Sequence, residues 1–262
     1  CSASGSVAEF TANGVALHVQ RLGDGSDQTV VFLHGLVMDN LSSWFFTAAT
    51  SAAQDSDVLL YDLRGHGRSE RPAAGYTVDD MVDDLAGLLD ALDIDEPVHL
   101  VGNSFGGLLA VSLAIAHPHR AASLVLVDGQ VLDEDWGAEM QGTLGLEGEE
   151  RDLMIASSFR DWLGRHSERK RNRLADNARA LVYETSLVAD LMASPPWEPA
   201  DLEALDVPAL LLYGSESDVR ERGEMLASLL PASELRIVEG ATHSILWEAT
   251  EDMKSAILDH LT

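Results

Sequence analysis

The chain has a single cysteine, Cys1, among its 262 residues, so no disulfide bond can form within it. It also has no apolar run long enough to span a membrane. Its first residues lack the charged segment followed by an apolar stretch that marks a secretory signal. These absences predict a cytoplasmic protein that does not insert into a membrane.

Basic residues are scarce, since 17 Lys and Arg stand against 44 Asp and Glu, for a net charge of −27. A chain this acidic repels nucleic acid and anionic membranes, so neither is expected as a partner. Eight of the 17 basic residues nevertheless lie between Arg151 and Arg179. We interpret this cluster as a solvated helix surface; the alternative is a docking site for an acidic carrier protein or an anionic substrate tail.

Apolar strand patterns alternate with helical patterns along most of the chain, and 46% hydrophobic residues are enough for a large core. From about residue 131 to 200 the strand patterns stop and only helical stretches remain. Alternation of this kind is typical of an α/β protein with a mainly parallel sheet. We therefore predict a core domain over residues 1–130 and 201–262, with a helical lid over residues 131–200.

The sequence Gly102-Asn103-Ser104-Phe105-Gly106 joins an apolar strand to an apolar helix. A G-x-S-x-G pattern in this context predicts a nucleophile elbow, a sharp turn that presents its serine at the edge of the sheet. Glycine is needed at the flanking positions because a side chain there would collide with neighbouring backbone. Ser104 is thus the candidate nucleophile.

A serine hydroxyl becomes a good nucleophile only when a base takes its proton. Among nine histidines, His243 follows the last strand, in a loop at the same sheet edge as Ser104. It is the candidate base. The other histidines and the carboxylates do not show the spacing of metal ligands, so no metal site is expected.

Two aspartates could orient the base, and both keep the chain order Ser…Asp…His. Asp218 follows the strand that ends at Tyr213, whereas Asp128 ends the strand after the elbow. Glu216 is a weaker third candidate. Each could instead cap the helix that follows it.

A tetrahedral intermediate needs backbone donors for its negative charge. The N–H of Phe105, next to the nucleophile, and the N–H of Leu36, after His34-Gly35, are the candidates. Aromatic and methionine side chains of the insert are expected to line an apolar substrate pocket. They are Trp136, Met140, Phe159 and Trp162.

Four motifs taken together resemble the α/β-hydrolase superfamily. They are His34-Gly35, Asp62-Leu63-Arg64-Gly65-His66-Gly67-Arg68-Ser69, Gly102-Asn103-Ser104-Phe105-Gly106-Gly107 and Gly240-Ala241-Thr242-His243. The resemblance covers the whole chain outside the insert. It implies an eight-stranded, mostly parallel sheet, a Ser-His-Asp triad and no cofactor.

Within that superfamily, the elbow and Trp247-Glu248 are similar to hydrolases that cleave carbon–carbon bonds in ring-fission products. Those enzymes carry a glycine-rich turn after the first His-Gly, where this chain has Leu36-Val37-Met38-Asp39, which counts against C–C cleavage. By resemblance to that group the triad acid is Asp218, which we favour. By resemblance to polyketide-releasing thioesterases it is Asp128.

These observations predict a serine hydrolase that cleaves a carboxylic ester, lactone or thioester with a sizeable apolar or polyketide-like acyl group. The small-molecule substrate would form an acyl-enzyme on Ser104. The enzymatic alternative is hydrolysis of a C–C bond in a vinylogous diketone by the same residues. An alternative of another class is a ligand-binding receptor or a cyclase built on this fold.

Overall fold

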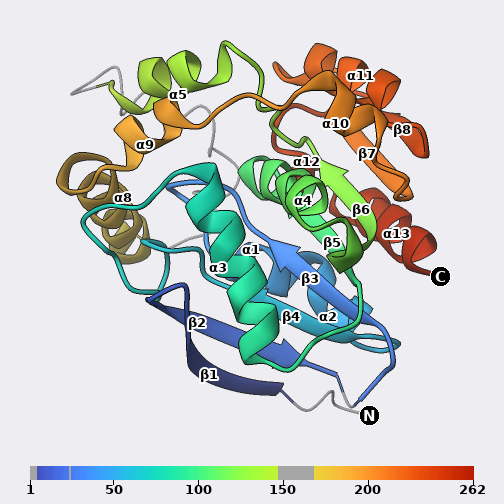
Figure 1. The fold of residues 1–262 in the computed structure, drawn as a ribbon, viewed down its shortest axis with the longest axis horizontal. Coiled ribbons are helices and arrows are strands. Elements are labelled where there is room, and N and C mark those ends of the chain that lie inside the picture. The colour runs from blue at the N-terminus through green and yellow to red at the C-terminus, as the bar shows by residue number, and fades with distance from the viewer. Residues whose placement is uncertain (1–4, 24, 147–167) are drawn as a thin grey trace.

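The architecture is an eight-stranded sheet flanked by helices, seen in a computed structural model that describes residues 5–23, 25–146 and 168–262 (Figure 1). The strand order is β1-β2-β4-β3-β5-β6-β7-β8. The β1–β2 and β2–β4 pairs are antiparallel and the other pairs are parallel. The predicted eight-stranded, mostly parallel sheet is thus confirmed. The strands are β1 (Gly5–Ala12), β2 (Val15–Leu22), β3 (Thr29–Leu33), β4 (Asp57–Tyr61), β5 (Val98–Asn103), β6 (Ala121–Val127), β7 (Ala209–Gly214) and β8 (Ser233–Val238).

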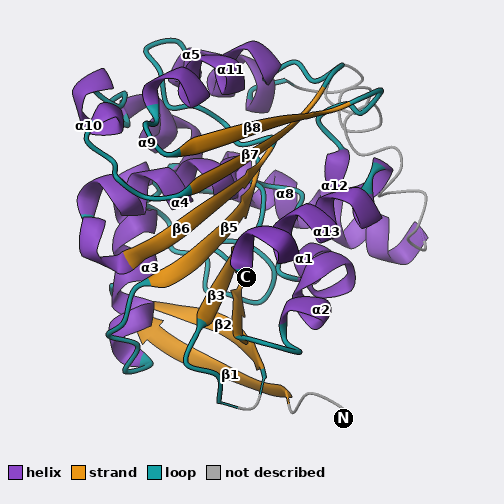
Figure 2. Cartoon of the chain, turned by 90° about the vertical axis from the view of Figure 1, so that its right-hand side faces the viewer, coloured by secondary structure: helices purple, strands orange, loops and turns teal. Residues whose placement is uncertain are grey.

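Helices cover both faces of the sheet (Figure 2). Helices α3 (Val78–Ala91) and α4 (Phe105–Ala116) pack on one face, while α12 (Ile245–Glu248) and α13 (Thr250–Leu261) pack on the other. The second face also carries the helical segment α1 (Ser42–Trp44), η1 (Phe45–Ala49) and α2 (Thr50–Ala52). The sequence predicts one helix near residues 44–53; the structure instead has a π-helical turn at η1 in its middle.

Period-two side-chain alternation divides the core between the two faces. In β3, Val31 and Leu33 join the apolar cluster under α3 and α4, whereas Val30 and Phe32 join the cluster under α13. All four side chains are fully buried. This is the burial pattern of a parallel strand covered by helices on both faces. Because the strands are parallel, their carboxyl ends lie at the same edge of the sheet.

In the described part of the chain between β6 and β7 there are four helices and no strand, as predicted. They are α5 (Trp136–Leu144), α8 (Glu168–Glu184), α9 (Leu187–Ala193) and α10 (Pro199–Glu203). Most of their buried side chains, including Trp136, Leu181 and Leu191, belong to the same apolar cluster as α3 and α4, whereas Leu174 and Ala178 of α8 form a separate cluster with Met38. The division into a core domain and a lid stays a prediction.

Polar contacts also tie this segment to the loop before α3. The Asp190 carboxylate accepts the N–H groups of Gly75 and Tyr76 at 3.1 and 2.8 Å, and Ser194 Oγ accepts the N–H of Val78 at 3.0 Å. Helix α11 (Arg220–Leu229) connects β7 to β8. Within the ranges described, no helix is both long and apolar enough to cross a membrane.

Candidate active site

Ser104 lies at the junction of β5 and α4, where the backbone turns sharply. Its φ of +53° and ψ of −117° form a strained conformation for an L-residue. The flanking glycines make the turn possible. A Cβ on Gly102 would lie 2.3 Å from the backbone of Gly106, and one on Gly106 would lie 2.1 Å from the carbonyl oxygen of Leu33. Only glycine fits at either position, as the G-x-S-x-G pattern predicts.

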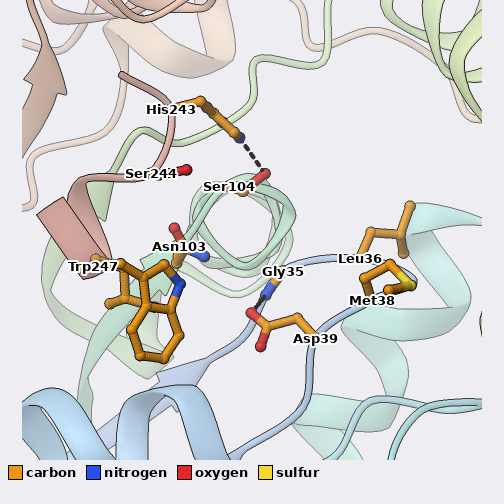
Figure 3. A pocket seen from close by; sticks show the side chains of 10 residues that line it. Gly35, Leu36, Met38, Asp39, Asn103, Ser104, His243, Ser244 and Trp247 are labelled. Carbon is orange, nitrogen blue, oxygen red and sulfur yellow. Dashed lines mark hydrogen bonds between the residues drawn. The ribbon is translucent and has the colours of Figure 1, made fainter. Parts of the chain in front are cut away.

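His243 lies in the loop between β8 and α12, and its ring points at the serine (Figure 3). The distance from His243 Nε2 to Ser104 Oγ is 2.9 Å. The exposed Glu248 carboxylate holds this loop because it accepts hydrogen bonds from the Thr242 N–H and hydroxyl at 2.7 and 3.0 Å. The structure therefore brings together the two side chains that the sequence predicts as nucleophile and base.

The two candidate acids have different environments. Asp218, in the loop before α11, places Oδ1 at 3.9 Å from His243 Nδ1, and its side chain is 84% exposed. No described residue is within hydrogen-bond distance of that Nδ1. Glu216 is exposed and makes no contact with the His243 ring. Of the candidates, Asp218 is the one whose carboxylate lies within 4.0 Å of the histidine ring.

Asp128 is instead fully buried at the end of β6, with a φ of +44°. Its Oδ1 accepts the N–H of Gly214 at 3.2 Å, and its Oδ2 has no partner among the described residues. Burial raises the pKa of this carboxyl to about 7, while the Gly214 N–H opposes the shift. Asp128 therefore joins β6 to β7, and near pH 7 its carboxyl carries only part of a charge.

The electrostatics of the base favour its neutral form. Burial lowers the pKa of the His243 imidazole below its usual 6.5, and the negative charge of Asp218 opposes that shift. A neutral imidazole at pH 7 can accept a proton from the serine.

The two backbone N–H groups predicted as donors are both available. As the first residue of α4, Phe105 has no acceptor for its N–H within the helix. The N–H of Leu36 has no acceptor in the described part of the chain, whereas the N–H of Gly35 before it is bound to Asp39 Oδ2 at 2.8 Å. Phe105 directly follows Ser104 in the chain, and Leu36 lines the same pocket as Ser104.

A pocket of about 550 Å³, counting the open space at its mouth, lies over these groups. Residues from three segments of the chain line it, and most were not among the sequence candidates. They are Gly35, Leu36, Met38, Asp39, Asn103, Ser104, His243, Ser244, Leu246 and Trp247 (Figure 3). These lining residues could have been identified from the sequence, because they lie next to the His-Gly, elbow and histidine motifs.

The expected aromatic lining needs correction. Trp136 is fully buried and stacks on Phe105 with ring centroids 6.0 Å apart, so it is a core residue and does not line this pocket. Met140 is half-buried against the same apolar cluster and is also not part of the lining. Phe159 and Trp162 lie outside the described residues.

The basic cluster is only partly described. Arg173 and Arg179 are exposed on α8, while the side chains of the remaining six basic residues lie outside the description. The apolar side of α8 reaches the active-site loops, since Leu174 and Ala178 pack on Met38 of the pocket.

Comparison with known proteins agrees with this architecture. Residues 28–250 match the family model for the alpha/beta hydrolase fold. The chain is 34% identical over 207 residues to Lipase LipV of Mycobacterium tuberculosis, covering 77% of this chain and 71% of the lipase. It is 35% identical over 160 residues to a 2-hydroxymuconate semialdehyde hydrolase of Pseudomonas sp., a match that covers 56% of this chain and about half, 56%, of that relative.

Among solved structures, an enol-lactonase from Burkholderia xenovorans superposes with a TM-score of 0.76 at 24% identity, covering 97% of this chain and 99% of the other. The chain therefore belongs to the alpha/beta hydrolase fold family. Its relatives thus include a lipase and a 2-hydroxymuconate semialdehyde hydrolase, and an enol-lactonase shares its fold.

Proposed function

We propose that this protein is a serine hydrolase that cleaves esters, lactones or thioesters of uncharged acyl groups through an acyl-enzyme on Ser104. The observation that carries the proposal is the 2.9 Å contact between Ser104 Oγ and His243 Nε2 in the lining of the pocket. A lipase and an enol-lactonase among its relatives and structural neighbours support the same class of bond.

The reaction divides into two acyl transfers. As Ser104 Oγ bonds to the acyl carbon, His243 Nε2 takes its proton, and the N–H groups of Leu36 and Phe105 hold the carbonyl oxygen as it becomes an anion. The bond to the leaving group then breaks, and His243 returns the proton to the departing alkoxide or thiolate. Water next gives a proton to His243, attacks the acyl carbon and frees the acid, and Ser104 regains its proton.

Asp218 is proposed as the acid that orients His243. Its Oδ1 lies 3.9 Å from His243 Nδ1, and among the candidate acids it alone raises the pKa of the histidine. Asp128 is the rival for this role. Its buried carboxyl is engaged with the Gly214 N–H and is partly protonated near pH 7, which makes it a poor partner for an imidazolium.

The preference for an uncharged acyl group rests on Asp39. A Cβ at Gly35 would lie 3.3 Å from Asp39 Oδ2 and 3.7 Å from Ser104 Cβ, so this carboxylate is close to the reacting centre. Each of its oxygens accepts a backbone N–H, from Gly35 and Asn40, at 2.8 Å. No Lys or Arg is part of the described pocket lining, so no cation there offsets the repulsion between Asp39 and an anionic acyl group.

The test is a panel of p-nitrophenyl esters, lactones and acyl thioesters assayed with the wild type and Ser104→Ala. We expect turnover that Ser104→Ala abolishes, together with stoichiometric labelling of wild-type Ser104 by a fluorophosphonate. Turnover that survives Ser104→Ala would refute the acyl-enzyme. Binding of these compounds without labelling or turnover would instead favour a receptor or a cyclase.

Hydrolysis of a carbon–carbon bond is the second candidate, because 2-hydroxymuconate semialdehyde hydrolase is a relative at 35% identity. Loss of colour from a ring-fission dienoate would reveal this activity. Such a substrate carries a carboxylate, so the position of Asp39 argues for the ester reaction.

Docking of an acidic carrier protein at the basic cluster also remains a proposal. Neutralising Arg169, Lys170, Arg171 and Arg173 should slow turnover of a carrier-bound acyl group much more than that of a small ester. Equal effects on both substrates would exclude docking.

A further inference from the structure

Two buried histidines lie behind the loop that carries the Leu36 donor. His34 directly follows β3, and His66 lies in the glycine-rich turn after β4; their exposed fractions are 0 and 3%, and their ring centroids are 5.2 Å apart. The roles assigned above to nucleophile, base, acid and oxyanion donors do not include either ring.

Each histidine binds the backbone of the other's loop. His34 Nε2 accepts the N–H of Leu63 at 3.0 Å, and His66 Nε2 accepts the N–H of Val37 at 2.7 Å. Because Nε2 is the acceptor in both rings, the proton of each neutral ring is on Nδ1. His34 Nδ1 donates to the Gly35 carbonyl at 2.7 Å, and His66 Nδ1 donates to the Arg64 carbonyl at 2.8 Å.

These bonds determine where the Leu36 N–H points. The carbonyl of Gly35 and the N–H of Leu36 belong to one planar trans peptide, so they point in opposite directions. Since His34 holds that carbonyl, the N–H is directed away from the His34 ring. His66 then holds the next peptide, in which Val37 has a φ of +67°, a conformation that a β-branched residue adopts only under constraint.

On this basis we propose that His66 is a positioning residue for the oxyanion hole. Its bond to the Val37 N–H keeps the left-handed turn after Leu36 in place, and with it the direction of the Leu36 donor. The inference rests on the proposed acyl-transfer function, because the donor matters only if an oxyanion forms beside Ser104. It implies that His66 must be neutral, since a protonated Nε2 would become a donor and lose the Val37 bond.

Burial is consistent with that requirement. It lowers the pKa of His66 to about 3, and the neighbouring His34 acts in the same direction. The arrangement is therefore expected to persist across the pH range in which His243 works.

Two substitutions test the role of His66 Nε2 as an acceptor independently of the rest of the ring. In His66→Gln the side-chain oxygen can reach the position of Nε2, whereas the shorter amide of His66→Asn can reach the Arg64 carbonyl but not Val37. His99→Asn is the control, because His99 is a half-buried strand histidine that bonds to Ser123 Oγ away from the pocket. All variants are assayed for p-nitrophenyl ester hydrolysis, thermal unfolding and inhibition by an aryl boronic acid.

We expect His66→Asn to lower kcat by about 10- to 100-fold and to weaken boronic acid binding by a similar factor, because the boronate adduct places an oxygen in the oxyanion hole. KM should change by no more than about twofold, and so should inhibition by a neutral alcohol that carries the same aryl group as the boronic acid. His66→Gln should recover most of both losses, and His99→Asn should show neither.

The proposal is overturned if folded His66→Asn keeps wild-type kcat and boronate affinity, or if KM rises and alcohol affinity falls by the same factor as boronate affinity. If His66→Asn does not fold, His66→Gln decides: a folded Gln variant that has lost kcat and boronate affinity refutes the role of the acceptor. Ser104→Ala distinguishes failure of the proposed function from failure of the proposed role of His66. Activity that survives it refutes the proposed function, while loss of activity there with normal His66 variants refutes the positioning role alone.

Discussion

His243 has two opposing influences on its charge, and both are measurable. Burial lowers its pKa below 6.5, and the negative charge of Asp218 raises it in part. The acid limb of kcat/KM should therefore have its midpoint below 6.5, because only the neutral imidazole accepts the serine proton. In Asp218→Asn the limb should move to still lower pH, and the plateau should fall by at least about tenfold.

Asp128→Asn is the matched control for that pH profile. Asp128 is not among the groups that shift the pKa of His243, so its removal should leave the acid limb in place. If Asp128→Asn shifts the acid limb and Asp218→Asn does not, the acid that orients His243 is Asp128 instead.

Asp128 itself should reduce stability at alkaline pH. Its pKa is about 7 in the folded chain against 3.8 for an ordinary aspartate. Between these values the folded state binds more protons than the unfolded state, so the free energy of unfolding falls as pH rises and levels off above about 7. At ~1.4 kcal/mol per pKa unit, the whole decline amounts to about 4 kcal/mol.

Asp128→Asn should abolish this decline, because its amide stays neutral and its oxygen can still accept the Gly214 N–H. Urea unfolding at pH 5 and pH 8.5 measures the part of the decline above pH 5, about 3 kcal/mol, with the exposed Asp206→Asn as the control. If the wild type and Asp128→Asn lose stability in parallel, the carboxyl is ionised in both folded and unfolded chains.

Residues differ in how far their roles can be predicted from sequence. Ser104 and His243 could be found because glycine spacing and chain order mark them. Trp136 could not be placed, since an aromatic residue in a helical segment has the same pattern whether it faces a pocket or packs on Phe105. The sequence does not indicate a role for Asp39 in substrate selection, because its place in the pocket depends on the fold of the His34-Gly35 loop around it.

At the scale of elements, the turn after β4 is clamped to α3 by a buried ion pair. Arg64 Nε donates to Asp84 Oδ2 at 2.6 Å, its terminal nitrogens reach Asp84 Oδ1 and the Gly75 carbonyl, and both charged side chains are buried. The turn that carries His66 is thereby connected to the helix layer.

We expect Asp84→Asn to reduce the free energy of unfolding by about 3–5 kcal/mol, because it leaves the Arg64 charge buried without a counterion. The double variant Arg64→Met/Asp84→Leu should lose less than this single change, because it removes both charges together. Urea unfolding of the wild type, Arg64→Met, Asp84→Leu and the double variant measures the coupling. Losses that simply add would show that the two groups act independently.

Elements were predictable where their pattern is strong. The continuous apolar runs of β3, β5, β6 and β7 indicate strands that are buried on both faces, and the structure has them there. The π-helical turn at Phe45–Ala49 could not be predicted, because one extra residue in a helical turn leaves the apolar pattern nearly unchanged. Likewise, the helices between β6 and β7 share their core with α3 and α4, and no local pattern indicates which helices share a core.

At the scale of the whole molecule, the net charge of −27 and the carboxylate of Asp39 act on an anionic substrate over different distances. The general field is screened by salt within about 8 Å at physiological ionic strength, whereas a partly buried charge beside the bond to be cleaved is screened much less. Salt dependence therefore separates the two contributions.

The mono-p-nitrophenyl ester of adipate and the neutral p-nitrophenyl hexanoate form a suitable pair of substrates. At low salt the wild type should prefer the neutral ester by about tenfold or more in kcat/KM, and salt should reduce but not remove that preference. Asp39→Asn and the exposed Asp252→Asn change the net charge equally. Only Asp39→Asn should remove the part of the preference that resists salt, because only Asp39 lies in the pocket. If both variants behave alike, discrimination comes from the general field, and the pocket itself accepts acyl groups of either charge.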